Sequence, residues 1–152
     1  MSFLRPADCA WLLAGKDTLR GDYPLNWEAS IPMTDWRGIR IASDAGLHLV
    51  LEAVSDIRPE LNGSIPVELG NLSKLESLVL SGFQLSGPIP VELANLSKLK
   101  YLRLDKNQLD GWIPVELGNL QNLHRLDLGD NLLVVAQIIP LPLSQVNLQS
   151  FS

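Results

Sequence analysis

Three side chains of the 152-residue chain could supply thiol or imidazole chemistry: the single cysteine, Cys9, and the two histidines, His48 and His124. A thiol enzyme needs a cysteine held against a histidine beside an oxyanion site. Nothing in the spacing of these residues indicates such a contact, and three soft ligands are too few for a structural zinc set. We therefore expect Cys9 to be a buried structural residue.

Other possible catalytic groups also have structural explanations. The segment Gly15-Lys16-Asp17 lacks the upstream glycine and the Ser/Thr of a phosphate-binding loop, and no G-x-G-x-x-G is present. Glu68, Glu92 and Glu116 each follow a proline by two residues, where negative charge suits the first turn of a helix. The sequence therefore predicts a protein that is not an enzyme, with no catalytic residues, cofactor or metal site.

Composition limits the partners. The chain has 12 Lys and Arg against 17 Asp and Glu, a net charge of −5, whereas nucleic-acid binding depends on clustered positive charge. No apolar run approaches the ~18 residues that a spanning helix needs. We expect neither nucleic-acid binding nor membrane insertion, and the length suits one domain over residues 1–152.

The cellular compartment has to be inferred from weak signals. One cysteine permits no intrachain disulfide, and Arg5 and Asp8 interrupt the N-terminal apolar residues, so no signal-peptide core is recognisable. These features favour a cytoplasmic location. Secretion remains the alternative because three potential N-glycosylation sequons occur: Asn62-Gly-Ser64, Asn71-Leu-Ser73 and Asn95-Leu-Ser97.

An internal repeat organises the middle of the chain. The motif Leu-x-Gly-x-Ile-Pro-Val-Glu-Leu starts at Leu61, Leu85 and Leu109, at a constant step of 24. Each unit continues as Leu-x-x-Leu-x-Leu, whose last pair has the period of a strand with one buried face. One strand per unit requires parallel neighbours, and the segments after Pro66, Pro90 and Pro114 are too short for full α-helices. We therefore expect 3₁₀ or single helical turns as the return path.

These units resemble the leucine-rich repeat family, in its plant-type form L-x-x-L-x-L-x-x-N-x-L-x-G-x-I-P-x-x-L-x-x-L. The resemblance implies an α/β fold: a right-handed solenoid with a parallel sheet on its concave face, short 3₁₀ turns on its convex side and a helical N-terminal cap. Asn107 and Asn131 occupy the asparagine position that bonds to the backbone of adjacent coils, whereas Phe83 replaces it in the first full unit. We expect local looseness, or a bend that is atypical for the family, near Phe83. The glycines at 63, 87 and 111 are expected to adopt positive φ.

The two ends are less regular than the repeats at 47–131. Residues 1–46 resemble the family's N-terminal cap, with Trp11, Leu12 and Leu19 at a spacing compatible with a helix. Secreted plant receptors carry a cysteine pair where this chain has Thr34 and Ile41. The resemblance therefore implies a disulfide-free cap, which must hold by the packing of Trp27 and Trp36.

The first strand and the tail do not follow the repeat period. The same step back from Leu80 reaches Asp56, which does not belong in a core, so we expect an insertion before Leu61 and leave the register of 47–58 open. In the tail, 132–152, Ile139-Pro140-x-x-Leu143-x-x-Val146 repeats the spacing that ends at Leu120, which predicts a degenerate last half-repeat. Its uncharged residues either cap the final coil or leave an edge for weak dimerisation.

A binding surface is expected on the concave face, where side chains between the buried leucines form columns. Its centre combines an aromatic residue with arginines, which are types enriched at binding hot spots. A solvated face with ion pairs is the competing interpretation. The candidate residues are Val79, Tyr101, Arg103, Asp105, Lys106, Arg125, Asp127 and Asp130, with Trp112 as a possible separate anchor that could instead be partly buried.

The sequence therefore predicts a monomer or weak dimer that binds a protein or peptide, in recognition or signalling. One alternative is a secreted inhibitor or surface-binding protein, similar to the plant inhibitors of cell-wall hydrolases. The other is a self-associating fragment of a larger leucine-rich-repeat receptor, kinase or ROCO-type GTPase.

Overall fold

The protein is described from a computed structural model. The structure describes residues 6–15, 18–20, 30, 39–41, 47–52, 61–134 and 146–147.

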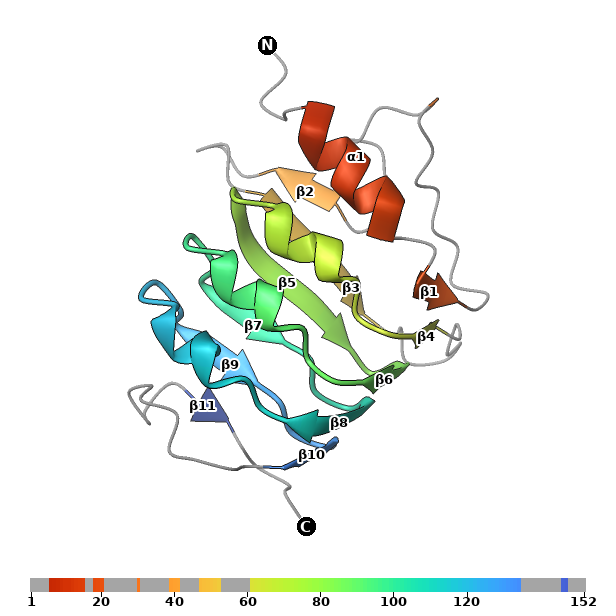
Figure 1. The fold of residues 1–152 in the computed structure, drawn as a ribbon, viewed down its shortest axis with the longest axis vertical. Helices are drawn as coiled ribbons and strands as arrows, with labels where there is room; N and C mark the ends of the chain where they lie inside the picture. The colour runs from red at the N-terminus through yellow and green to blue at the C-terminus, as the bar shows by residue number, and fades with distance from the viewer. Residues whose placement is uncertain are drawn as a thin grey trace.

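The chain winds into stacked coils, and the first three each contain a strand, a second short strand and a 3₁₀ helix (Figure 1). Before them come helix α1 (Pro6–Gly15) and strands β1 (Leu19–Arg20) and β2 (Ile39–Ile41). The coils contain β3 (Leu47–Glu52), β4 (Asn62–Gly63), η3 (Val67–Asn71), β5 (Leu75–Ser81), β6 (Gln84–Gly87), η4 (Val91–Asn95), β7 (Tyr101–Arg103), β8 (Gln108–Trp112), η5 (Val115–Asn119), β9 (Arg125–Asp127) and β10 (Leu132–Val134). Strand β11 (Val146–Asn147) follows.

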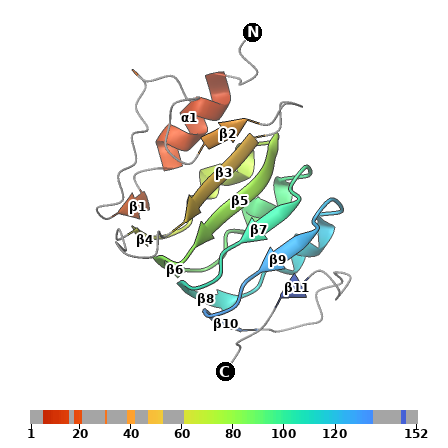
Figure 2. The ribbon, with the colours of Figure 1, turned by 180° about the vertical axis from the view of Figure 1, so that it is seen from behind.

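The strands form two sheets. The larger, which is the predicted concave sheet, has the order β11-β9-β7-β5-β3-β2, with parallel pairing throughout except between β2 and β3. Figure 2 shows β3, β5, β7 and β9 side by side, with the 3₁₀ helices behind them. A second sheet, β1-β4-β6-β8-β10, was not predicted. It forms because the residues that leave each concave strand stack in register too.

The 3₁₀ helices confirm the predicted return path. Pro66, Pro90 and Pro114 precede η3, η4 and η5 with φ of −63°, −61° and −59°. The proline ring fixes φ at these values, so each helix entry is preset by the sequence. Glutamates 68, 92 and 116 lie in the first turns, as expected for structural acids.

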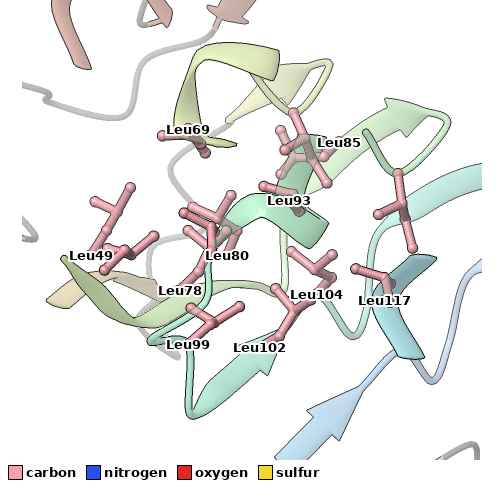
Figure 3. Packing of buried hydrophobic residues seen from close by; sticks show 14 of the residues in the cluster. Leu49, Leu69, Leu78, Leu80, Leu85, Leu93, Leu99, Leu102, Leu104 and Leu117 are labelled. Atoms are coloured by element: carbon pink, nitrogen blue, oxygen red, sulfur yellow. The ribbon is translucent and has the colours of Figure 1, made fainter. Parts of the chain in front are cut away.

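Leucines that recur once per repeat fill the space between the concave sheet and the 3₁₀ helices (Figure 3). Leu78, Leu102 and Leu126 are fully buried, as are Leu80, Leu104 and Leu128. Fully burying a leucine side chain contributes about 1.5–3 kcal/mol. Because each coil adds leucines to the same column, one continuous core stabilises the stack.

An asparagine ladder connects neighbouring coils. Asn107 Oδ1 accepts a hydrogen bond from Leu85 N at 3.1 Å, and Nδ2 donates to Leu80 O at 2.7 Å and Leu104 O at 3.0 Å. Asn131 repeats the pattern one coil later, with Leu109 N and Leu104 O. The predicted role of both asparagines is therefore confirmed. Phe83, at the preceding position, is 7% exposed and belongs to the core; the expected looseness there stays a prediction.

Helix α1 differs from the predicted cap helix. It ends at Gly15, so Leu19 lies on β1 instead, where it is buried. Leu12 is 0% exposed, whereas Trp11 is 39% exposed. Cys9 lies within α1, but its side chain is outside the described residues, as are Trp27 and Trp36.

The register of the first strand is now defined. Leu49 pairs with Leu78 and Leu51 with Leu80. The number of residues between these paired positions is larger than the regular step from Leu61 to Leu85. The additional residues therefore lie between Leu51 and Leu61, which confirms the expected insertion.

The predicted register of the tail is wrong. Val146 pairs with Leu126 of β9, not with the position of Leu120 that the Ile-Pro spacing suggested. The better signal was Leu143-x-x-Val146-x-Leu148, which repeats the strand pattern after a coil shorter than the regular repeat. Strand β11 thus extends the concave sheet along β9, as expected if the tail caps the final coil.

Gly70 allows η3 to approach η4 closely. A Cβ atom at Gly70 would overlap with the carbonyl oxygen of Glu92, a contact that only a backbone shift relieves. Gly70→Ala is expected to lower the free energy of unfolding by about 1–3 kcal/mol, measured by denaturant unfolding. Gly118→Ala is the control and should be milder, because no 3₁₀ helix follows η5 in the described part of the chain. Equal effects of both substitutions would contradict the close-approach explanation.

Candidate binding surface

The concave face is formed by side chains that alternate with the buried leucines of β7 and β9. Tyr101 and Arg103 flank Leu102, and Arg125 and Asp127 flank Leu126. Parallel pairing places Tyr101 beside Arg125 and Arg103 beside Asp127. Strand geometry therefore brings four of the predicted residues into one patch.

The predicted site residues differ in the exposed fraction of their side chains. Tyr101 is 41% exposed, and the Arg125 side chain is 56% exposed. Arg103 is intermediate, with a side chain 34% exposed. Val79 is only 5% exposed, so we remove it from the candidate surface. It pairs with Val50 on one side and Arg103 on the other, and only the three-dimensional register reveals these neighbours.

A network of ion pairs and hydrogen bonds extends across three coils. Asp127 Oδ2 accepts a hydrogen bond from Arg125 Nε at 2.7 Å and lies 3.3 Å from Arg103 Nε. Asp105 Oδ1 lies 3.7 Å from Arg103 Nε and accepts a hydrogen bond from Ser81 Oγ at 2.7 Å. Asp127 is buried and is a supporting residue, not a contact residue. The network holds both guanidinium groups in place.

His124 extends the surface and was not among the predicted site residues. Its ring centroid lies 6.1 Å from that of Tyr101, with 59° between the ring planes. The Nδ1 atom of His124 is 2.6 Å from Asn122 O, which orients the ring. The sequence signal was its place one repeat after Lys100, whose Nζ pairs with Glu76 Oε2 at 2.7 Å.

Lys106 and Asp130 lie at the rim, beyond the ends of β7 and β9. Both are exposed and adopt the left-handed conformation, with φ of 58° and 54°, where Gly82 of the preceding coil has φ of 80°. Their backbone therefore belongs to the turn that leaves the concave sheet. The glycines at 63, 87 and 111 have φ of 94°, 81° and 76°, as predicted.

Trp112 belongs to a different surface. It lies on β8 of the second sheet, in register with Val134 of β10, and is 61% exposed. Leu132 and Val134 are 69% and 46% exposed. We call Trp112, Leu132 and Val134 the flank patch. Most of the Trp112 surface is therefore exposed, and its role as an anchor stays a prediction.

The described residues that could bind a metal ion or support thiol chemistry are not grouped together. They contain no group of three or more His, Cys, Asp or Glu side chains placed to hold a metal ion. His48 lies on β3 and His124 just before β9, with β5 and β7 between those strands, and Cys9 lies in α1. Among the described helices, none is sufficiently long and apolar to span a bilayer.

Comparisons with known proteins agree with this geometry. A family model described as Leucine Rich Repeat matches residues 74–96 and 98–120, and a search of curated protein sequences found no match. Among solved structures, one similar chain comes from the BIR3–SERK2 complex of Arabidopsis thaliana, at 30% identity and a TM-score of 0.67, covering 83% of this chain and 70% of that one. The BIR2 ectodomain from Arabidopsis thaliana has 30% identity and a TM-score of 0.73, with 83% of this chain and 68% of that chain covered.

A longer neighbour is similar to this chain over a small part of its own length. It is the ectodomain of the receptor kinase GASSHO1/SCHENGEN3 from Arabidopsis thaliana, in complex with CASPARIAN STRIP INTEGRITY FACTOR 2. Identity is 32% and the TM-score 0.71, over 82% of this chain but 15% of that one. The repeat pattern, the stacked coils and relatives that share 30% identity over more than two thirds of their length together show that the chain belongs to the leucine-rich repeat family, with plant-type repeats.

Proposed function

We propose that the chain is a non-enzymatic module, one domain over residues 1–152, that binds a protein or peptide on its concave face. The single observation that carries this proposal is the pair Tyr101–Arg125. These residues lie side by side on β7 and β9, and both are substantially exposed. Tyrosine and arginine are residue types that dominate binding energy at interfaces.

The arrangement of the pair lowers the entropic cost of binding. Arg125 is held through Nε by Asp127, and Tyr101 packs near His124. Side chains that are fixed before binding lose less conformational entropy when a ligand arrives. A guanidinium group that uses Nε for the protein keeps its terminal N–H groups for acceptors on a peptide backbone or side chain.

The site of action is proposed to be outside the cell. The structural neighbours include ectodomains of the plant proteins BIR2, GASSHO1/SCHENGEN3 and SOBIR1. This likeness favours the secreted alternative over the cytoplasmic location expected from the sequence. The single cysteine means that the cap would work there without an intrachain disulfide.

Tyr101→Ala and Arg125→Ala are each expected to weaken ligand binding about tenfold, equivalent to ~1.4 kcal/mol, as for interface residues of these types. The ligand is first captured on the immobilised wild-type chain from the extracellular fraction of the native tissue. Its dissociation constant is then measured by titration calorimetry. Circular dichroism confirms that each variant is folded.

Trp112→Ala is the matched control, since it truncates an exposed aromatic residue on the other sheet. Binding should be unchanged in this variant. If Tyr101→Ala binds like the wild type and Trp112→Ala does not, the concave-face proposal is wrong and the flank patch is the binding surface.

The flank patch supports a second candidate function, self-association. Its three side chains are exposed on strands that pair with each other, and among the described strands β10 is the last of its sheet. Light scattering distinguishes this candidate: a monomer mass that does not change with concentration excludes it, and a dimer that Val134→Lys dissociates supports it.

A further inference from the structure

The turns that join the 3₁₀ helices to the next concave strands are nearly identical in three successive coils. Asn71, Asn95 and Asn119 each end a 3₁₀ helix and are exposed. In each turn the carbonyl oxygen of the asparagine accepts a hydrogen bond, 2.9 Å long in all three, from the backbone N–H two residues later. The three turns therefore present their asparagine side chains in the same way.

Only the first two turns carry a glycosylation sequon. Asn71 and Asn95 are followed at the second position by Ser73 and Ser97, which are also exposed, whereas Asn119 is followed by Gln121. N-glycosylation requires Asn-x-Ser/Thr and a surface position for the attached glycan. Both conditions are met at Asn71 and Asn95.

We propose that Asn71 and Asn95 carry N-linked glycans, an inference that rests on the extracellular site proposed above. The donor is a lipid-diphosphate-linked oligosaccharide. The Asn Nδ2 atom forms a bond to C1 of the first sugar and loses a proton to solvent, while the bond from C1 to the diphosphate oxygen breaks and the lipid diphosphate leaves. No oxidation or reduction takes place.

The position of the two turns is compatible with ligand binding on the concave face. They lie at the edge where β5 and β7 begin, and Figure 1 shows β6 and β8 at the opposite edge. The two glycans project from neighbouring coils on one side of the solenoid. Tyr101 and Arg125, on the concave strands, remain accessible, as does the flank patch.

The third sequon is expected to be unmodified. Asn62 is half-buried and lies on β4, between β1 and β6, where it pairs with Arg20 and Gln84. A glycan attached to Asn62 would have to extend from a residue that has a neighbouring strand on each side.

Peptide mass spectrometry of the chain isolated from its native tissue, before and after treatment with an N-glycosidase, tests the proposal. We expect glycans on Asn71 and Asn95 and none on Asn62. Native chain without a glycan on either residue would overturn the proposal, and a glycan on Asn62 would overturn the burial criterion that selects the sites.

A second experiment tests the turns independently of where the native chain is located. Variants of the chain are fused to an added signal peptide and secreted from eukaryotic cells. Ser73→Ala and Ser97→Ala should each remove one glycan while keeping the asparagine. Gln121→Ser should add a third glycan, on Asn119, because it completes a sequon in the same turn. Absence of a glycan on Asn119 in this variant would contradict the equivalence of the turns.

The glycosylation result is independent of the result of the ligand-binding test. Enzymatically deglycosylated chain should bind its ligand as tightly as the glycosylated chain, since neither turn lies on the concave strands. Glycans present together with unaltered binding by Tyr101→Ala would contradict only the proposed function. Glycans absent together with weakened binding by Tyr101→Ala would contradict only the glycosylation proposal.

Discussion

Leu102→Ala is expected to lower the free energy of unfolding by about 2–5 kcal/mol, the range for truncating a buried leucine. Leu102 is 0% exposed and lies on β7, between the coils of β5 and β9. Its removal loses burial and leaves a cavity that neighbouring leucines, themselves fixed by the parallel register, fill only partly. Urea unfolding followed by circular dichroism measures the effect.

Val91→Ala is the control for this prediction. Val91 is also a repeat residue, but it is 46% exposed at the start of η4. Its truncation should change the free energy of unfolding by no more than about 0.5 kcal/mol, as expected for a surface substitution. Equal effects of the two substitutions would contradict the position of the leucine column.

The central location of Leu102 makes the effect global. In a solenoid each repeat contacts only its neighbours, so stability depends on the interfaces between successive coils. Weakening the coil of β7 affects its interfaces with both the preceding and the following coil. We therefore expect amide hydrogen exchange to accelerate in β5 and β9 as well as in β7.

The leucines, asparagines and glycines of the repeats could be placed from the sequence because each recurs at a constant step. Successive coils have the same local environment, so the same residue type recurs at equivalent positions, such as those of Leu102, Asn107 and Gly111. Their burial, amide bonding and positive φ follow from residue type together with the period. The 3₁₀ helices follow for the same reason, since proline fixes their entry.

The registers of the elements that break the period were left open or predicted wrongly. The register of β3 depends on an insertion between Leu51 and Leu61, and that of β11 on a shortened coil. Neither change alters the local strand pattern, so pairing across strands was needed to define them. The sequence did not show that α1 ends at Gly15, because Leu19 continues the apolar spacing of the helix although it lies on strand β1.

The candidate surface was predicted in outline and corrected in detail. Alternation along a strand places Val79 and Asp127 on the concave face, but it does not reveal which neighbours cover them. Both are nearly inaccessible, so exposure had to come from the structure. The pairing of Arg103 with Asp127 of the next coil similarly depends on side-chain reach across strands.

Asn107→Ala is expected to destabilise the chain by about 3 kcal/mol, because two buried backbone groups lose a partner at about 1–3 kcal/mol each. These groups are the N–H of Leu85 and the C=O of Leu80, both bonded to the Asn107 amide. The C=O of Leu104 keeps a hydrogen bond from Asn131 Nδ2 at 2.9 Å. The measurement is the free energy of unfolding, with hydrogen exchange of the Leu85 amide as a local readout.

Asn107→Asp separates hydrogen bonding from packing, because aspartate has nearly the same shape. It keeps an acceptor for Leu85 N but places a second oxygen where Nδ2 now lies 2.7 Å from Leu80 O. Repulsion between those oxygens should destabilise this variant as well, even though no cavity is created. If Asn107→Asp were as stable as the wild type while Asn107→Ala was not, packing and not the donated hydrogen bond would explain why this position needs a side chain of this shape.

Phe83 shows why the asparagine matters at some coils and not at others. It occupies the position one repeat before Asn107, yet it is buried without an amide group. The segment that precedes it, from Leu51 to Leu61, is longer than its counterpart from Leu80 to Leu85, so Phe83 does not follow a coil of regular length. Asn107→Phe should therefore be destabilising although phenylalanine is native one coil earlier, since the regular coil before Asn107 presents Leu85 N and Leu80 O to that side chain. Wild-type stability of Asn107→Phe would show that the regular coil can satisfy these groups without the ladder.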